Sequence, residues 1–199
     1  MIAFITQIQY EEGEVPDMKR KTLSIFLWDA ILLALLIGLD QFTKYLVQTH
    51  LYEKSVDIVK GIFALTYSTN TGAAWGILSG KVDFFIVVCV VLLFVISFFL
   101  FRCIYVIQHF DIQITLKKKF IWIQCLFIFL LSGACGNLID RIRLRYVIDF
   151  LDFKLIQFPI FNVADCYVSV SVLFLGFLLL SMKDEELSLL MPAKNIPQQ

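Results

Sequence analysis

Histidine and charged residues are scarce in this sequence, and each scarcity excludes a class of protein. Only two histidines occur in 199 residues, His50 and His109. They are far apart and lack HExxH spacing, so a zinc site of that kind is not expected. Charged residues make up 17% of the chain, with 17 basic against 17 acidic. Because no basic surface is available to neutralise phosphates, we expect no nucleic acid partner.

The cysteines also lack the spacing of a functional site. None of the five forms a CxxC pair, and four lie in apolar runs, where cysteine behaves as a small hydrophobic residue. They are Cys89, Cys103, Cys125, Cys135 and Cys166. No cluster places His, Cys and carboxylate at metal-ligand spacing. We therefore predict an activity that needs no metal and no other cofactor.

Apolar residues, in contrast, are abundant. They make up 59% of the chain, with 20 phenylalanines and a mean hydropathy of +0.81, which is too apolar for a soluble domain of this size. Four runs are each close to the roughly 20 residues that a helix needs to cross a bilayer core of about 30 Å. These runs are about 23–47, 84–101, 120–139 and 160–182. The sequence predicts an all-α membrane protein with four transmembrane helices.

Basic residues indicate the orientation of these spans. Segments 19–21 and 117–119, together with Arg102, fall on the same side of a four-span topology. The positive-inside rule makes that side cytoplasmic, so both termini are expected there. We expect polar tails at residues 1–22 and 184–199, and one four-helix membrane domain over residues 23–183.

The two connections on the outer side are rich in strand-forming residues. Residues 56–59 and 62–67 are separated by Gly61, and residues 146–153 form a third such run. Strands with open edges are not tolerated inside lipid. We therefore expect a small sheet at the outer membrane surface.

Four aspartates gather near the outer ends of the predicted spans. Asp165 lies 18 residues before Lys183, or about 27 Å along a helix, so it belongs near the outer edge of the apolar core. Asp140 closes the third span on this side, Asp149 follows it, and Asp40 lies at the outer end of the first span. An intramembrane acid is costly and usually functional.

Three interpretations of these acids are open from topology and charge alone. Two carboxylates that share a proton can activate water and polarise a carbonyl group, which is the chemistry of aspartic proteases. The acids could equally form a transport or proton-relay site. They could also be halves of structural ion pairs with Arg141 or Lys44.

Five short motifs favour the first interpretation. In chain order they are Asp40-Gln41-Phe42-Thr43-Lys44, Asn70-Thr71-Gly72-Ala73-Ala74-Trp75, Gly133-Ala134-Cys135-Gly136-Asn137-Leu138-Ile139-Asp140-Arg141, Val147-Ile148-Asp149-Phe150 and Phe161-Asn162-Val163-Ala164-Asp165. With them the chain resembles the bacterial lipoprotein signal peptidases, also called signal peptidase II, over about residues 24–182. Each motif alone is weak, but five in this order are highly specific.

The resemblance implies a four-helix aspartic endopeptidase of the bacterial cytoplasmic (inner) membrane, with a periplasm-side β-cradle. Such enzymes remove the signal peptide from diacylglyceryl-modified prolipoproteins by cutting just before the lipidated cysteine. The implied partners are lipid-modified prolipoproteins, membrane lipids and peptide inhibitors that block the aspartate pair.

The resemblance also implies the site residues. It makes Asp149 and Asp165 the catalytic pair and Asp140 a supporting residue. Distance along the chain alone does not choose between Asp140 and Asp149. The family's other substrate-binding or supporting positions map onto Asp40, Lys44, Asn70, Gly72, Asn137, Arg141 and Asn162.

Helical spacing gives several of these residues a structural interpretation as well. Asp40 and Lys44 are four residues apart and can form an ion pair on one helix face. Asn137, Asp140 and Arg141 share a face by similar spacing. We expect Arg141 to hold Asp140 through a bidentate pair.

The remaining polar and small residues near the motifs carry further expectations. Asn70 and Asn162 can donate hydrogen bonds to a substrate backbone or to the aspartate pair. Gly133 and Gly136 permit close approach of two helices. Asp29 has no counterpart in the motifs, and we expect its carboxylate to reach toward the inner membrane surface.

Two rival functions fit the sequence less well. An ion-coupled transporter of this size would show repeats and helices broken at mid-depth, whereas these acids lie at one surface beside strand-forming loops. A non-catalytic assembly protein would not need two separate acids beside asparagines.

Overall fold

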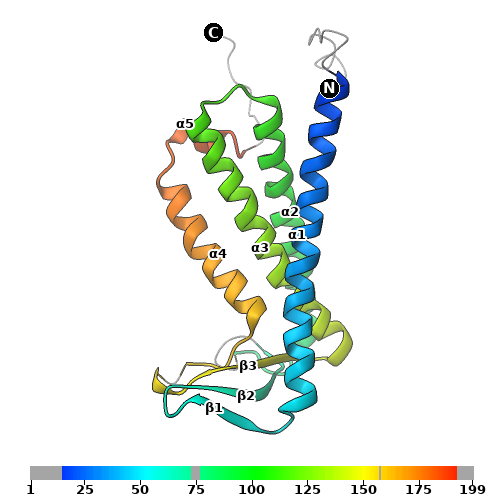
Figure 1. Ribbon diagram of the computed structural model, residues 1–199, viewed down its shortest axis with the longest axis vertical. Coiled ribbons are helices and arrows are strands. Elements are labelled where there is room, and N and C mark those ends of the chain that lie inside the picture. Colours follow the sequence, from blue (N-terminus) through cyan, green and yellow to red (C-terminus); the bar gives the residue numbers. More distant parts are fainter. Residues whose placement is uncertain (1–14, 73–76, 157, 192–199) are drawn as a thin grey trace.

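Four long helices and a small sheet make up the structure (Figure 1). The computed structural model describes residues 15–72, 77–156 and 158–191, with only the backbone described for 15–22. The helices are α1 (Val15–His50), α2 (Val82–His109), α3 (Ile114–Leu144) and α4 (Val163–Leu180). Each contains an apolar stretch long enough to cross a membrane. The predicted four-span helical fold is confirmed.

Three of the helices extend past the apolar runs from which they were predicted, whereas α4 lies within its predicted run of 160–182. Helix α1 begins at Val15 rather than near residue 23, and α2 continues through Arg102 to His109. A charge-free run marks only the part of a helix that can lie in hydrocarbon, whereas backbone hydrogen bonding continues into the polar interface. Helix α2 ends only where Phe110 adopts an extended conformation.

The predicted strands are present as one antiparallel sheet across the end of the helices (Figure 1). Its strands β1 (Ser55–Val59), β2 (Phe63–Asn70) and β3 (Val147–Phe153) lie in that order. Strands β1 and β2 come from the connection between α1 and α2, and β3 comes from the connection between α3 and α4. Ser68 pairs with Asp149, so the end of β2 lies beside that aspartate.

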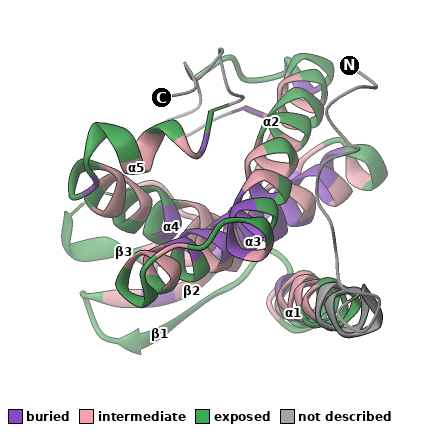
Figure 2. Cartoon of the chain, turned by 90° about the horizontal axis from the view of Figure 1, so that it is seen from above, coloured by how far each residue is buried: buried purple, intermediate pink, exposed green. Residues whose placement is uncertain are grey.

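Helix α3 lies at the centre of the bundle and contacts α1, α2 and α4 (Figure 2). In its half far from the sheet, the buried side chains Phe120 and Ile123 belong to an apolar core that includes Val106 of α2. In the half next to the sheet, α3 buries polar side chains instead, among them Asn137 and Asp140. The polar interior lies where the motifs meet.

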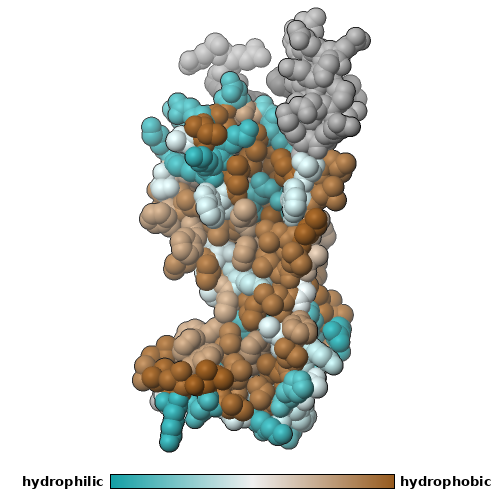
Figure 3. Space-filling model, viewed as in Figure 1, coloured by the Kyte–Doolittle hydropathy of each residue, from teal (hydrophilic) through white to brown (hydrophobic). Residues whose placement is uncertain are grey.

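The outer surface of the bundle is apolar. Figure 3 shows hydrophobic residues over the sides of the helices, with hydrophilic residues gathered toward the ends. Leu35, Phe94 and Leu180 are among the large apolar side chains left exposed. Such a surface is costly in water and favourable in lipid, as expected of membrane-spanning helices.

The segment after α4 packs against the helix ends away from the sheet. It forms the short helix α5 (Asp184–Ser188), and Leu190 is buried in the same apolar core as Phe120. The Arg102 side chain donates from Nε to the carbonyl oxygen of Leu189 at 2.8 Å. Residues 184–191 therefore pack against α2 and the core.

Close approach of α3 and α4 depends on glycine, as the sequence predicted. A Cβ atom added at Gly133 would lie 2.5 Å from the Ala164 carbonyl oxygen and 2.7 Å from Val168 Cγ2. Gly133→Ala should therefore lower the free energy of unfolding by about 1–3 kcal/mol. At Gly176, also in a helix, nothing lies within 4 Å of the added Cβ, so Gly176→Ala should not destabilise. Equal thermal stabilities of the two variants in one detergent would contradict this contact.

Candidate active site

Asp165 lies in the first turn of α4, where a reciprocal cap fixes its carboxylate. The Asp165 backbone N–H donates to Asn162 Oδ1 at 3.0 Å, and the Asn162 backbone N–H donates to Asp165 Oδ2 at 3.1 Å. Such a capping box satisfies two backbone donors that a helix start leaves free. The acid is thereby held at the end of the bundle that faces the sheet.

Asp149 lies on β3 and is buried, with amide donors on both carboxylate oxygens. Asn162 Nδ2 donates to Asp149 Oδ1 at 2.7 Å, and Asn70 Nδ2 donates to Oδ2 at 3.1 Å. Asn162 therefore contacts both acids, through its side chain to Asp149 and through its backbone to Asp165. The end of β2 and the start of α4 together fix the Asp149 carboxylate.

Asn137 connects Asp165 to a buried lysine. Its Nδ2 donates to Asp165 Oδ1 at 2.8 Å, while its Oδ1 accepts from Lys44 Nζ at 3.0 Å and from Asn162 Nδ2 at 3.1 Å. The amide orientation is fixed by these partners, since only an oxygen can accept from the lysine. Asn137 therefore joins Asp165 and Asn162 to the positive charge of Lys44.

The environment of Asp149 favours its protonated form. Burial raises the pKa of Asp149 to about 7, and the nearby negative charge of Asp165 acts in the same direction. The hydrogen bonds from Asn70 and Asn162 and the charge of Lys44 oppose this rise in pKa. Two neighbouring acids of this kind titrate as a pair and can share one proton near neutral pH.

A buried ion cluster lies behind the pair. Lys44 Nζ is 2.9 Å from Asp40 Oδ2 and 3.0 Å from Asp140 Oδ2, and all three side chains are at most 3% exposed. Asp40 Oδ1 also accepts from the Ala164 backbone N–H at 2.9 Å, and Asp140 Oδ2 accepts from the Ile148 backbone N–H at 3.2 Å. The cluster ties α1 and α3 to α4 and β3. The predicted pairing of Asp40 with Lys44 is present.

Gln41 belongs to this cluster, although its sequence position alone predicted no role for it. Its Nε2 is 3.0 Å from Asp140 Oδ1, 3.2 Å from Asp40 Oδ2 and 3.1 Å from the Gly136 carbonyl oxygen. Gly136 is needed here, because a Cβ atom at this position would overlap the Asp40 carboxylate. Gln41 is a polar residue next to Asp40 in a membrane-spanning helix, and this placement could have identified it from the sequence.

The predicted bidentate pair of Arg141 with Asp140 is wrong. Arg141 Nη2 donates to the Gly72 carbonyl oxygen at 3.2 Å and Nη1 to the Asn137 carbonyl oxygen at 3.4 Å, while the guanidinium lies 5.3 Å from the Phe85 ring centre. Consecutive residues on a helix point in different directions. Asp140 therefore faces Lys44, and Arg141 faces the loop that follows β2.

That loop is fixed on both sides of Gly72. Its backbone N–H donates to Asn70 Oδ1 at 2.9 Å, and its carbonyl oxygen accepts from Arg141. A Cβ atom added at Gly72 would lie 2.6 Å from the Ile77 carbonyl oxygen. Ala73, Ala74 and Trp75, which complete the motif, lie outside the described residues.

All ten site residues expected from the sequence lie in one connected network around Asp149 and Asp165. Their individual roles stay predictions. Within residues 15–72, 77–156 and 158–191, no group of three or more His, Cys, Asp or Glu side chains is arranged to hold a metal ion. The arrangement provides two carboxylates that can share a proton, amide donors that orient them, and a buried lysine behind them.

Comparison with known families shows the class of protein to which the chain belongs. The family model described as signal peptidase (SPase) II matches residues 32–181, which include all ten network residues. The chain belongs to the signal peptidase II family. It is accordingly an aspartic peptidase with membrane-spanning helices, as the motifs predicted.

Individual relatives support membership in the signal peptidase II family. The lipoprotein signal peptidase of Enterococcus faecalis is 43% identical over 141 residues, which cover 70% of this chain and 80% of the relative. That of Caldanaerobacter subterraneus is 41% identical over 152 residues, covering 75% and 94%. A solved bacterial membrane enzyme superposes with a TM-score of 0.62 at 30% identity, covering 78% of this chain and 94% of that structure. The fold and the enzyme class are confirmed.

Proposed function

We propose that this enzyme removes the signal peptide from diacylglyceryl-modified prolipoproteins by cutting before the lipidated cysteine, with Asp149 and Asp165 as the catalytic pair. The observation that carries the proposal is the convergence of these two acids at one end of the bundle. They come from β3 and α4, and Asn162 contacts both. The names of the relatives, which are lipoprotein signal peptidases, support this choice of substrate.

In the proposed reaction the ionised acid removes a proton from a water molecule, whose oxygen attacks the scissile carbonyl carbon. The protonated acid donates a hydrogen bond to the carbonyl oxygen as negative charge develops there. The tetrahedral intermediate then breaks its C–N bond, and the leaving nitrogen receives a proton from the pair. A pKa of about 7 for Asp149 allows the pair to hold one proton near neutral pH.

The other network residues have positioning roles in this proposal. Asn137 and Asn162 orient the two carboxylates, and Lys44 supplies a positive charge that favours one net negative charge on the pair. Asp40 and Asp140 hold Lys44 in place. Because a lysine paired with two acids is fixed in position, its charge acts on the aspartate pair at constant geometry.

Arg141, Asn70 and Gly72 form the proposed substrate side of the site. Arg141 anchors the loop at Gly72, and Asn70 extends from the end of β2 to Asp149. An extended peptide lying along this loop would present its carbonyl group to the pair while main-chain hydrogen bonds hold it. Peptide inhibitors that block the pair would occupy the same place.

We place the enzyme in the bacterial cytoplasmic membrane with both termini in the cytoplasm. The segment 117–119 provides three lysines at the end of the bundle away from the sheet, which supports a cytoplasmic location for that end. The aspartate pair then lies near the outer face. The sheet exposes the apolar residues Val56, Ile58 and Phe153, which supports contact with the membrane surface and with substrate lipid.

The proposal is tested by incubating the purified full-length protein with a diacylglyceryl-modified prolipoprotein and with the same precursor lacking the lipid. We expect release of the signal peptide from the modified precursor only, with a product that begins at the lipidated cysteine in mass spectrometry. Cleavage at another bond, or equal cleavage of both precursors, would contradict the proposed specificity.

Asn70→Ala should reduce kcat/KM about two- to tenfold at pH 6, because a hydrogen bond is typically worth about 0.5–1.5 kcal/mol. It should also weaken the binding of a peptide inhibitor that blocks the aspartate pair. It should also change the pH profile. The pair loses its shared proton as the pH rises through the pKa of Asp149, about 7, so activity falls there. The Asn70 hydrogen bond lowers this pKa, so its removal should move the falling limb to higher pH.

Thr69→Ala is the matched control for Asn70→Ala. Thr69 precedes Asn70 on β2, but its side chain is exposed. We expect its kinetics, inhibitor affinity and pH profile to equal those of the wild type. If Asn70→Ala behaves like Thr69→Ala in all three measurements, the Asn70 side chain contributes neither to catalysis nor to inhibitor binding.

A further inference from the structure

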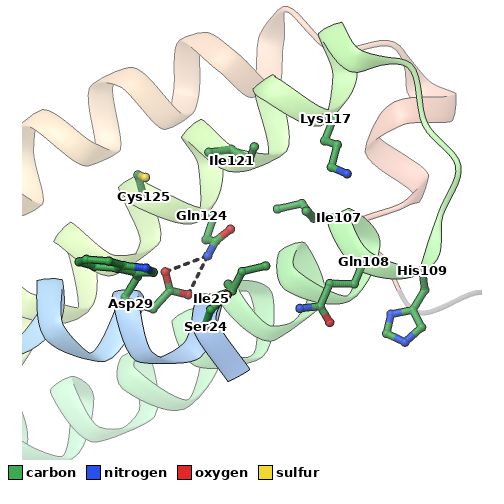
Figure 4. A pocket seen from close by; sticks show the side chains of 11 residues that line it. Ser24, Ile25, Asp29, Ile107, Gln108, His109, Lys117, Ile121, Gln124 and Cys125 are labelled. Atoms are coloured by element: carbon green, nitrogen blue, oxygen red, sulfur yellow. Dashed lines mark hydrogen bonds between the residues drawn. The ribbon is translucent and has the colours of Figure 1, made fainter. Parts of the chain in front are cut away.

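A second polar site lies at the end of the bundle away from the sheet, where α1, α2 and α3 enclose a cavity of about 530 Å³ (Figure 4). Asp29 lines it from α1, His109 from the end of α2, and Lys117 and Gln124 from α3. None of these residues belongs to the network around the aspartate pair. Asp29 also lies outside the five motifs that define the proposed active site.

The Asp29 carboxylate is held in a fixed position. Gln124 Nε2 donates to both of its oxygens, at 2.9 and 2.7 Å, and the Gln124 side chain is buried (Figure 4). Asp29 is half-buried, and its partner on α3 fixes the direction of its carboxylate. The expectation that it reaches toward the inner membrane surface stays a prediction. Each carboxylate oxygen has two acceptor sites, so this one donor leaves Asp29 able to accept further N–H groups.

A basic residue lies nearer the helix ends. Figure 4 shows the amine of Lys117 projecting into the space between α3 and α2. No ion pair joins Lys117 to an acid within the described part of the chain. Lys117 is seven residues from Gln124, about 10 Å along the helix. The site therefore has its negative group deeper in the bundle and its positive group nearer the helix ends.

Apolar side chains line most of the rest of the cavity, beside the polar residues Ser24 and Gln108. Ile25 and Ile121 contribute to its walls. Trp28, which also lines it, is 70% exposed, and tryptophan is enriched at the membrane interface. A ligand that fits must combine an N–H-rich cation, an anion and an apolar part.

We propose that this cavity binds the headgroup of an aminophospholipid, with the primary ammonium on Asp29 and the phosphate at Lys117. A primary ammonium supplies three N–H donors, whereas a choline headgroup supplies none. A zwitterion complements both charges of the cavity. The positive n-region of a signal peptide would also suit Asp29, but it would bring like charge toward Lys117. The lipid is therefore the better fit.

The test is a competition among lipids with identical acyl chains for the purified full-length protein in detergent, measured by native mass spectrometry. We expect phosphatidylethanolamine to be retained at least about tenfold over phosphatidylcholine, because hydrogen bonds to charged groups are worth about 1.5–3 kcal/mol. Asp29→Asn should remove this preference. Lys117→Gln should weaken retention of both lipids alike, because both carry the phosphate.

Asp111→Asn is the matched control, because Asp111 is an exposed acid at the same end of the bundle and lies outside the cavity. It should keep the wild-type preference, and the peptidase activity of Asp29→Asn in detergent should equal that of the wild type. Equal retention of the two lipids by the wild-type protein would overturn the proposal, whether or not Asp29→Asn folds. An unchanged lipid preference in Asp29→Asn, with a raised KM only for substrates that carry lysine in the n-region, would assign Asp29 to substrate recognition instead.

Discussion

Asp149→Asn and Asp165→Asn will each abolish measurable signal-peptide release. We expect turnover to fall by about 100- to 10 000-fold. Asparagine preserves the size of the side chain and an oxygen that can accept from Asn162, but it can neither take a proton from water nor donate one as an acid. General acid–base catalysis typically contributes about 10²–10⁴-fold. Turnover should be measured on lipidated substrate with full-length protein in one detergent.

Asp152→Asn provides the control for the catalytic pair. Asp152 lies on the same strand as Asp149 but accepts from Thr66 Oγ1 at 2.8 Å, away from the pair. It should retain near-normal turnover, and all three variants should show wild-type membrane insertion. Turnover near the wild-type level in either dyad variant would refute the assignment. If Asp140→Asn folded normally and were fully inactive, Asp140 would instead be a member of the catalytic pair.

Much of the fold could be predicted because membrane proteins leave strong local signals. Apolar runs with few or no charged residues located all four helices, and runs of β-forming residues located all three strands of the sheet. The pairing of Asp40 with Lys44 followed from a spacing of four on one helix. Each of these features depends on residues close together in the sequence, so no knowledge of the tertiary structure was needed.

The contacts between helices could not be predicted in the same way. Lys44 on α1 also pairs with Asp140 on α3, and Gln41 contacts both acids of that cluster. Which face of α1 lies against α3 depends on packing along the whole interface. The assignment of Arg141 to Asp140 failed because it considered only one helix, whereas the partner of Asp140 came from another.

The same limit applies to the cavity that Asp29 lines. Gln124 is separated from Asp29 by 95 residues and meets it only because α1 and α3 pack together. From the sequence, Asp29 was one acid near the end of an apolar run. The motifs predicted which residues gather at the aspartate pair, but motifs contain no information about sites outside them.

Lys44→Met should lower the free energy of unfolding by about 3–5 kcal/mol, the range found when one partner of a buried ion pair is removed. Asp40 and Asp140 would keep their negative charges inside the bundle without the cation that lies 2.9 and 3.0 Å from them. Methionine has a similar length and fills the space. The lowered free energy of unfolding is therefore caused by the missing positive charge and not by a cavity. Chemical denaturation in a single detergent would measure it.

Two further variants separate lost charge compensation from a general effect of removing a lysine. Lys154→Met removes the shorter Lys154–Asp57 pair at 2.6 Å, but those side chains are 37% and 42% exposed, so the cost should not exceed about 1 kcal/mol. Adding Asp140→Asn to Lys44→Met removes one uncompensated charge, so the double variant should recover part of the loss. Strictly additive effects of Lys44→Met and Asp140→Asn on the free energy of unfolding would mean that the two side chains do not interact. The ion cluster would then not hold α1 and α3 together behind the aspartate pair.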